Sequence, residues 1–233
     1  MKFLITRPLE QSKRFSCQLV EAFGGNIKVC ISPVIEINTL KKSINTTSFQ
    51  GLIFTSENGV RAFAKLNTER NLPAFCVGNQ TALVARSCGF LAVSAQGDTN
   101  QLILLLKEQA SELRLLYLRG KHVSADIEQE LRKDNIKVVS KIVYKQNPIK
   151  FTHQAVEFLS GPDKIIVPLF SDRSNVILSK QFFQKMNSMR IAICLSPTIA
   201  RNVNPLHYSK IYVSPNPNSV SLIEEIKRVI DMS

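Results

Sequence analysis

Short apolar runs alternate along this chain with longer segments in which apolar residues recur at helical spacing. Runs that are apolar throughout are typical of strands covered on both faces by other parts of a protein. We predict strands over residues 3–6, 27–31, 51–55, 74–77, 115–118, 138–144, 164–170, 191–195 and 211–213. Strands that alternate with helices of about 10 to 15 residues indicate βαβ units, parallel sheets and right-handed crossovers. The pattern therefore predicts a doubly wound α/β fold.

Several segments recur within the chain. The string Asn-Ile-Lys-Val occurs at 26–29 and at 135–138, each time after a strand, an arginine-containing turn and a helix-like stretch. Three further pairs of strand-to-helix segments resemble one another: 52–60 and 166–176, 75–82 and 193–200, and 97–106 and 214–230. If these pairs are called a, b and c, and the segment ending in the repeated string is called d, the chain reads d, a-b-c-d, a-b-c. The first copy of d is thus completed only by the last part of the chain.

This order predicts two similar doubly wound modules joined by a two-stranded linker, with one module discontinuous in sequence. We expect the continuous module over residues 36–145 and the discontinuous one over 1–35 and 146–233, with linkers near 33–37 and 143–148. The chain has 233 residues, so each module is close to the common domain size of roughly 100–150 residues and can bury its own core.

The turns that follow the predicted strands are rich in hydroxyl groups, amides, glycines and arginines. In parallel sheets, ligands bind at the carboxyl ends of the strands, where helix N-termini offer free N–H groups to phosphates or carboxylates. The candidate binding residues are Ser56, Asn58, Gly78, Asn79, Thr81, Thr99, Arg119 and Gly120 in the continuous module, and Thr6, Arg7, Ser171, Ser196 and Thr198 in the discontinuous one.

A structural explanation stays open for each of these turns. Serine and threonine are also preferred helix N-caps, where each contributes about 1 kcal/mol to a helix. Gly78 and Gly120 could serve turns that need a positive φ angle. A duplication copies caps as well as binding sites, so the recurrence of the turns in both modules does not decide between the two explanations.

The net charge is the second indication of a ligand. Thirty lysines and arginines against eighteen aspartates and glutamates give a net charge of +12. This charge favours a polyanionic partner such as a nucleic acid, an acidic membrane surface or a multiply carboxylated small molecule. Charge alone would favour nucleic acid, but the basic residues are spread along the chain and no nucleic-acid motif is present. A solvated basic surface accounts for the same charge.

Cysteine and histidine usage predicts neither a zinc site nor a disulfide framework. The cysteines are odd in number and never form a Cys-x-x-Cys pair, and the histidines are scattered: Cys17, Cys30, Cys76, Cys88 and Cys194, and His122, His153 and His207. No apolar run approaches the roughly 20 residues of a membrane-spanning helix. Residues 1–7 lead into a strand rather than into a signal-peptide core. We therefore expect a cytoplasmic protein without a metal.

Taken in order, six of these segments resemble the uroporphyrinogen-III synthase family. The resemblance rests on their order and spacing along nearly the whole chain. The segments are Leu4-Ile5-Thr6-Arg7-Pro8, Phe54-Thr55-Ser56-Glu57-Asn58-Gly59-Val60, Val77-Gly78-Asn79-Gln80-Thr81-Ala82, Leu118-Arg119-Gly120, Val143-Tyr144 and Ser196-Pro197-Thr198-Ile199-Ala200.

The resemblance implies a cyclising lyase of tetrapyrrole and haem biosynthesis. Such an enzyme takes the linear hydroxymethylbilane, an octacarboxylate, inverts its last ring through a spiro intermediate and closes it as uroporphyrinogen III. The family has two α/β modules joined by a two-stranded linker, binds its substrate in the cleft between them, and needs no metal and no organic cofactor. We accordingly expect a monomer with no cofactor, no nucleic-acid partner and no membrane partner.

The resemblance also implies roles for individual residues. Tyr144 matches the family's linker tyrosine, whose phenol could donate a hydrogen bond to the departing hydroxyl; a packed linker residue is the structural alternative. Ser56, Thr81, Ser171 and Thr198 match the turns that would bind carboxylates, with Arg7 and Arg119 adding charge. The chain departs from the family pattern at Gly59, where alanine is more usual, and at Ser196, where a glycine is usual.

A second function uses the same turns. A two-domain α/β module that closes on an anionic metabolite without chemistry would need the same hydroxyls, amides and helix N-termini. The sequence alone does not separate this binding module from the synthase. The products formed from hydroxymethylbilane separate the two, because only a synthase directs closure to the inverted isomer.

Overall fold

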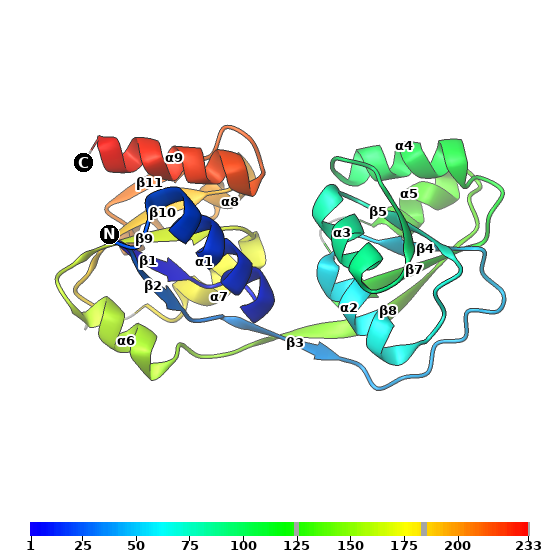
Figure 1. The fold of residues 1–233 in the computed structure, drawn as a ribbon, viewed down its shortest axis with the longest axis horizontal. Coiled ribbons are helices and arrows are strands. Elements are labelled where there is room, and N and C mark those ends of the chain that lie inside the picture. Colours follow the sequence, from blue (N-terminus) through cyan, green and yellow to red (C-terminus); the bar gives the residue numbers. More distant parts are fainter. Residues whose placement is uncertain (124–125, 183–185, 233) are drawn as a thin grey trace. The chain divides into compact units, whose positions relative to one another are not determined.

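The computed structural model describes residues 1–123, 126–182 and 186–232; residues 124–125, 183–185 and 233, which fall within the expected modules, lie outside the described residues. The chain forms two compact units, which we call unit 1 (Met1–Glu36 with Asn147–Ser233) and unit 2 (Ile37–Gln146). Each unit contains a parallel sheet with helices packed on it (Figure 1). The predicted α/β class with parallel sheets is confirmed.

Unit 1 is built around a five-stranded parallel sheet with the order β11-β10-β9-β1-β2. Its strands are β1 (Lys2–Ile5), β2 (Lys28–Ile31), β9 (Lys164–Leu169), β10 (Met189–Cys194) and β11 (Lys210–Val213). Its helices are α1 (Leu9–Phe23), α6 (His153–Ser160), α7 (Asp172–Ser179), α8 (Pro197–Arg201) and α9 (Ser219–Asp231), with a 3₁₀ turn at Pro205–His207.

The sheet of unit 2 has the order β3-β8-β7-β4-β5-β6. Its strands are β3 (Ile35–Thr39), β4 (Gly51–Phe54), β5 (Pro73–Cys76), β6 (Leu91–Ser94), β7 (Leu115–Gly120) and β8 (Val138–Pro148). Its helices are α2 (Glu57–Leu66), α3 (Asn79–Ser87), α4 (Thr99–Gln109) and α5 (Ile127–Lys133). The strands from β4 to β8 pair in parallel with one another.

The two sheets repeat one strand order. The order in unit 1 is β11-β10-β9-β1-β2, and the matching order in unit 2 is β6-β5-β4-β7-β8. In these two orders the strands of repeats a, b and d stand at equivalent positions. β1 and β2 therefore occupy the same places in unit 1 as β7 and β8 occupy in unit 2. The chain passes into unit 2 within β3 and back into unit 1 within β8.

Strands β3 and β6 were not among the predicted strands, and β8 continues four residues beyond the predicted end at 144. Along β3 and the β8 extension, Leu40 N–H donates to Val143 O (2.9 Å) and Ile149 N–H donates to Val34 O (3.0 Å). Residue numbers rise along one segment as they fall along the other, so the two segments are antiparallel. β6 is an edge strand with Leu91 65% exposed, and it therefore lacks the two-sided burial that the prediction relied on.

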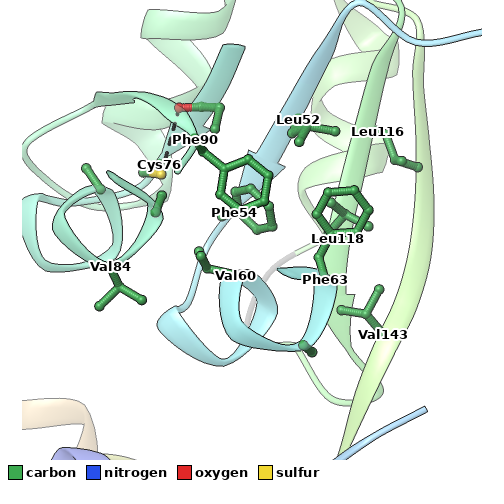
Figure 2. Packing of buried hydrophobic residues seen from close by; sticks show 14 of the residues in the cluster. Leu52, Phe54, Val60, Phe63, Cys76, Val84, Phe90, Leu116, Leu118 and Val143 are labelled. Atoms are coloured by element: carbon green, nitrogen blue, oxygen red, sulfur yellow. Dashed lines mark hydrogen bonds between the residues drawn. The ribbon is translucent and has the colours of Figure 1, made fainter. Parts of the chain in front are cut away.

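The core of unit 2 lies on both faces of its sheet. Leu52 and Phe54 of β4 point to the face covered by α2 and α3, where Phe54 packs against Phe63 and Phe90 at ring-centroid distances of 6.1 and 5.6 Å (Figure 2). Ile53 points to the other face, together with residues of α4 and α5. Alternate residues of one strand therefore belong to different cores, as the geometry of a strand requires.

The core of unit 1 packs α1 and α9 against the sheet. Phe3 and Ile5 of β1 are fully buried beside Phe15 of α1. The ring of Phe15 meets Phe170 edge-on at a centroid distance of 4.8 Å. This contact lies at the carboxyl end of β9, so core packing extends up to the turn that leads into α7.

We expect replacement of Arg70 to destabilise unit 2. Its guanidinium lies over the Phe90 ring, 4.5 Å from the centroid, and donates to the carbonyls of Cys88, Asn67, Glu69 and Ala64. An Arg70→Met variant is expected to lose about 3 kcal/mol of unfolding free energy, because several carbonyls lose a charged donor.

Urea denaturation checks this prediction. Arg86→Met is the matched control, since Arg86 is exposed and bonds only to the carbonyl of Ala92 in the described chain; it is expected to lose less than about 1 kcal/mol. Equal losses in the two variants would contradict a special role for Arg70.

We expect the unfolding free energy to fall at alkaline pH because two cysteine thiols are buried. Burial raises the pKa of Cys76 to about 12 and that of Cys194 to about 12, with a smaller opposing effect of Arg86 on Cys76 and a smaller reinforcing effect of Asp172 on Cys194. Because the folded pKa values lie above the unfolded value near 9.0, this stability is fully present below about pH 9 and is lost as the pH rises toward 12. The loss is about 1 kcal/mol per thiol for each pH unit in that window.

Urea unfolding under reducing conditions at several pH values measures the effect. A Cys194→Ala variant should show a shallower decline, whereas Cys17→Ser, at an exposed thiol, should keep the slope of the parent. An unfolding free energy that stays constant between pH 9 and 11 would rule out this contribution.

Candidate active site

A β-bulge at the carboxyl end of β7 places Tyr144. The parallel register pairs Arg119 with Ile142 and then Gly120 with Tyr144, so β8 carries one extra residue, Val143, at this point. Consecutive strand residues ordinarily point to opposite faces, but a bulge interrupts that alternation. Val143 and Tyr144 are both buried in the core cluster on the α2 and α3 face. The bulge therefore keeps the tyrosine ring on this face at the end of the sheet.

Gly120 leaves the space that the Tyr144 ring occupies. A Cβ atom at Gly120 would lie 2.7 Å from Tyr144 Cζ and 2.9 Å from its hydroxyl oxygen. A backbone hydrogen bond also joins the two strands at this point, because Lys121 N–H donates to Tyr144 O at 3.0 Å. The alternative that Gly78 and Gly120 serve a positive φ angle is wrong: Gly78 has φ −151°, and the positive-φ glycines of the described chain are Gly24 and Gly89.

Ser56 acts as a helix cap and contacts Tyr144 at the same time. Its hydroxyl oxygen accepts from Gly59 N–H at 3.2 Å, which caps α2, and lies 3.0 Å from the Tyr144 hydroxyl. Asn58, in the first turn of α2, also hydrogen-bonds to the phenol. The cap explanation and the binding explanation for this turn are therefore compatible. Gly59 packs tightly, because a Cβ there would lie 2.8 Å from Leu118 O.

Burial keeps the Tyr144 phenol protonated. The residue is 5% exposed, and desolvation raises its pKa above the usual value of 10.0. Hydrogen bonds with Ser56 and Asn58 act in the opposite direction and lower the pKa, but burial has the larger effect. At neutral pH the site therefore presents a neutral phenol that is hydrogen-bonded to Ser56 and Asn58, rather than a phenolate.

The other candidate residues of unit 2 lie at the carboxyl ends of neighbouring strands. Gly78 precedes α3, Asn79 is exposed, and Thr81 is only 6% exposed within that helix. Thr99 begins α4 after its cap Asp98, and the Arg119 guanidinium donates to Gly120 O at 3.1 Å. These residues share the sheet edge with Ser56 and Tyr144, although Thr81 is covered by other atoms.

The candidate residues of unit 1 lie at the carboxyl ends of the adjacent strands β10, β9 and β1. Ser171 caps α7 by accepting from Ser174 N–H at 3.2 Å, and Ser196 caps α8 by accepting from Ile199 N–H at 3.4 Å. Thr198 is exposed, Thr6 is 2% exposed, and the Arg7 guanidinium lies 3.9 Å from the centroid of the Phe170 ring. These turns therefore repeat the cap arrangement of unit 2, and among the described residues of unit 1 no tyrosine hydroxyl is hydrogen-bonded to Ser171 or Ser196.

Sequence reasoning missed a second hydroxyl pair. Thr55 Oγ1 lies 3.0 Å from the hydroxyl of Tyr117, which is 2% exposed in β7. Thr55 stands next to Ser56 in the motif at the end of β4, so its hydroxyl was a visible signal. Tyr117 gave no such signal, because within an apolar strand its ring is indistinguishable from a core residue.

A hollow in unit 2 lies at the opposite edge of the sheet. It has a volume of about 560 Å³ and is lined by residues at the amino ends of β4, β7 and β8, among them Gln50, Arg114 and Lys137. It is therefore separate from Ser56 and Tyr144. Within residues 1–123, 126–182 and 186–232, no group of three or more histidine, cysteine, aspartate or glutamate side chains is arranged to hold a metal ion.

The topology defines the class first: an α/β protein with two sheets whose parallel strands follow the same order, one of the sheets assembled from both ends of the chain. The model of the uroporphyrinogen-III synthase HemD family matches residues 14–224, and the chain belongs to this family. Family members are cyclising lyases of haem biosynthesis that act on a tetrapyrrole, and this chain is such an enzyme. The predicted family and enzyme class are confirmed.

Solved structures agree on the fold. A uroporphyrinogen-III synthetase from Helicobacter pylori 26695 matches with a TM-score of 0.67 at 19% identity, covering 98% of this chain and 100% of that one. A mutant uroporphyrinogen III synthase from the extremely thermophilic bacterium Thermus thermophilus matches with a TM-score of 0.54 at 14% identity, covering 100% of both chains. No curated protein sequence is significantly similar to this chain. Among the described residues, no helix is long and apolar enough to cross a membrane.

Proposed function

We propose that this chain closes hydroxymethylbilane to uroporphyrinogen III and that Tyr144 assists loss of the bilane's terminal hydroxyl as an acid. The observation that carries the role of Tyr144 is its 3.0 Å contact with Ser56 at the carboxyl edge of the sheet. A general acid has to hold its proton at working pH and direct it toward the leaving group. Burial, which raises the pKa of Tyr144, meets the first requirement.

The hydrogen bonds around Ser56 support the second requirement. Ser56 Oγ accepts from Gly59 N–H and lies 3.0 Å from the Tyr144 oxygen. Either hydroxyl can donate in this pair, and the proposed role requires that Ser56 donates. Asn58 adds a second hydrogen bond to the same phenol, one that stabilises negative charge there. With donors from Ser56 and Asn58, the phenolic proton is free to point toward a third group. That group would be the departing hydroxyl of the substrate.

The chemistry needs little more than this one proton. The proton leaves with the bilane hydroxyl as water, and the substrate becomes an azafulvenium cation. This cation attacks the substituted carbon of the last ring to give a spiro intermediate, which fragments and recloses with that ring inverted. The final ring loses a proton, which restores the phenol. The reactivity belongs to the substrate, so the main task of the enzyme is to hold it in the folded shape that leads to the spiro route.

The carboxylates of the substrate provide the contacts for that positioning. We expect Ser56, Asn58, Asn79 and Thr99 of unit 2 to bind them together with the backbone N–H groups that begin the adjoining helices. Gly78 and Gly120 allow close approach, the buried Thr81 acts through its backbone, and Arg119 adds positive charge. The net charge of +12 attracts an octacarboxylate from solution.

Unit 1 is expected to contribute a second group of binding residues: Thr6, Arg7, Ser171, Ser196 and Thr198. Arg7 supplies charge, and Ser171 lies at the start of the eight-residue helix α7. Ser196 is the weakest of the group, because it caps a helix of only five residues, whose dipole is small. We propose that units 1 and 2 are the two functional domains of the enzyme.

The assembly and the location of the enzyme are further parts of the proposal. We expect a monomer, without a nucleic-acid partner, that works in the cytoplasm. Light scattering during gel filtration measures the mass, for which a single chain corresponds to 26.1 kDa. Fractionation of cells followed by detection of the protein tests the location. Salt-sensitive binding of nucleic acid at physiological salt would contradict the absence of that partner.

An isomer assay tests the proposed reaction. The protein is incubated with freshly generated hydroxymethylbilane, and the products are oxidised to porphyrins and separated by chromatography. Isomer III is expected to dominate, whereas reactions without the protein give the uninverted isomer I. A product dominated by isomer I in the presence of folded protein would favour the alternative of a binding module without chemistry.

A further inference from the structure

We propose that Tyr117 is a positioning residue for this reaction. Through its contact with Thr55 it holds the turn between β4 and α2 in place, and so maintains the contact between Ser56 and Tyr144. The proposal rests on the proposed role of Tyr144. It assigns a function to a tyrosine that does not touch Ser56 and lies in an apolar strand. The carrying observation is the 3.0 Å contact between the Tyr117 hydroxyl and Thr55 Oγ1.

The two hydroxyl pairs approach the turn from opposite faces of the sheet. Ile53 belongs to the core cluster that contains Tyr117, whereas Phe54 belongs to the cluster that contains Tyr144. The alternation of a strand continues into the next two residues. Thr55 therefore meets Tyr117 on one face, and Ser56 meets Tyr144 on the other.

Burial of the Tyr117 hydroxyl favours its hydrogen bond with Thr55. The residue is 2% exposed, and Thr55 is the hydrogen-bond partner of its hydroxyl in the part of the chain that the structure describes. A buried hydroxyl without a partner is unfavourable, so the bond draws Thr55 toward β7. Thr55 itself is only half-buried and lies where β4 has already ended.

The strand positions connect Tyr117 to the reacting phenol. Tyr117 and Gly120 both belong to β7, which pairs with the Tyr144 strand β8. One strand thus supplies the space for the Tyr144 ring and the anchor for the turn that carries its partner Ser56. A shift of that turn by a fraction of an ångström would lengthen the distance between the Ser56 and Tyr144 oxygens. The strength of a hydrogen bond is sensitive to this distance.

A Tyr117→Phe variant tests the proposal. We expect kcat to fall about 3- to 10-fold, KM to change less than about 2-fold, and the share of isomer I to rise, because the turn positions the reacting group more than it binds substrate. Thr55→Val should give the same effects. Tyr117→Phe combined with Thr55→Val should lose little more than either alone, since both act through one bond. Thr55→Ser, which keeps a hydroxyl, should regain most of what Thr55→Val loses.

Tyr208→Phe is the matched control. Tyr208 is also a buried tyrosine, but it lies in unit 1 and its hydroxyl has no hydrogen-bond partner among the described residues. Its replacement is expected to leave kcat, KM and the isomer ratio unchanged. An equal loss in Tyr208→Phe and Tyr117→Phe would show that removal of any buried hydroxyl lowers activity, and would overturn the positioning role.

A readout without substrate separates this proposal from the proposed function. In protein with ¹³C-labelled tyrosine rings, NMR titration follows the phenol of Tyr144, whose pKa the bond with Ser56 lowers. Tyr117→Phe should weaken that bond and raise the pKa of Tyr144 further, whether or not the wild type forms isomer III. An unchanged titration of Tyr144 together with an unchanged kcat would overturn the proposal. Absence of isomer III from the wild type would instead overturn the proposed function.

Discussion

Tyr144→Phe is expected to lower the rate of uroporphyrinogen III formation about 100-fold, at the lower end of what a positioned general acid contributes. The variant keeps the buried ring, which is 5% exposed, and removes only the hydroxyl that lies 3.0 Å from Ser56. Binding of the bilane carboxylates does not require that hydroxyl, so KM should change little. The measurement is kcat at saturating substrate, together with the isomer composition of the products.

Tyr212→Phe provides the control for this variant. Tyr212 lies in β11 of unit 1, where its ring is 5.9 Å from the Arg228 guanidinium carbon, and loss of its hydroxyl should leave the rate unchanged. Circular dichroism and the unfolding midpoint show whether each variant remains folded. If Tyr144→Phe forms isomer III at the rate of the wild type, the phenol has no part in the mechanism.

Gly120→Ala is expected to reduce activity nearly as far as Tyr144→Phe. The added methyl group would lie 2.7 Å from Cζ and 2.9 Å from the hydroxyl oxygen of Tyr144, so the ring has to move away from Ser56. Overpacking of a buried site also costs stability, here about 1–3 kcal/mol of unfolding free energy. The combined effect on rate and stability is measured by isomer assays and urea denaturation of the same protein preparation.

Gly25→Ala is the matched control for Gly120→Ala. A Cβ at Gly25 meets no atom within 4 Å, and Gly25 is not among the positive-φ residues. Its replacement should change neither the rate nor the stability by more than about 0.5 kcal/mol. In addition, Gly120→Ala combined with Tyr144→Phe should be about as slow as Tyr144→Phe alone, because both changes act on one hydroxyl. Wild-type activity in Gly120→Ala would contradict the tight contact.

The two variants test different parts of the site. Tyr144→Phe removes the acid and leaves its position intact, whereas Gly120→Ala keeps the acid and displaces it. A large effect of the first with no effect of the second would mean that the ring tolerates movement. The opposite result would mean that the carboxyl end of β7, and not the phenol, is what the reaction requires.

Part of the fold could be predicted from the chain because its signals are local. Apolar runs such as 164–170 and 191–195 became β9 and β10, since burial on both faces leaves a continuous apolar pattern in the sequence. β6 does not have that pattern, because it is an exposed edge strand. The internal repeat contained the missing information: the predicted strand at 211–213, which is β11, has its counterpart in β6 at the equivalent end of the same strand order.

The candidate site divides in the same way. Ser56, Asn58, Gly120 and Tyr144 were candidates from the chain alone, because strand ends and family motifs identify turns. Their connection was not predictable, since it depends on a bulge that brings Gly120 and Tyr144 together across β7 and β8. Such a register is decided by the packing of residues distant in the sequence, and the residues on either side carry no local sign of it.

The sequence by itself determined the α/β class, the repeated segments, the net charge and the set of residues at strand ends. Each of these follows from composition or from short-range pattern. Tertiary structure alone decided that Tyr144 contacts Ser56, that Gly120 is needed for space rather than for its φ angle, and that Tyr117 anchors Thr55. These contacts join residues 24 to 88 positions apart in the chain, and such distances are closed only when the strands pair and the two faces of the sheet pack.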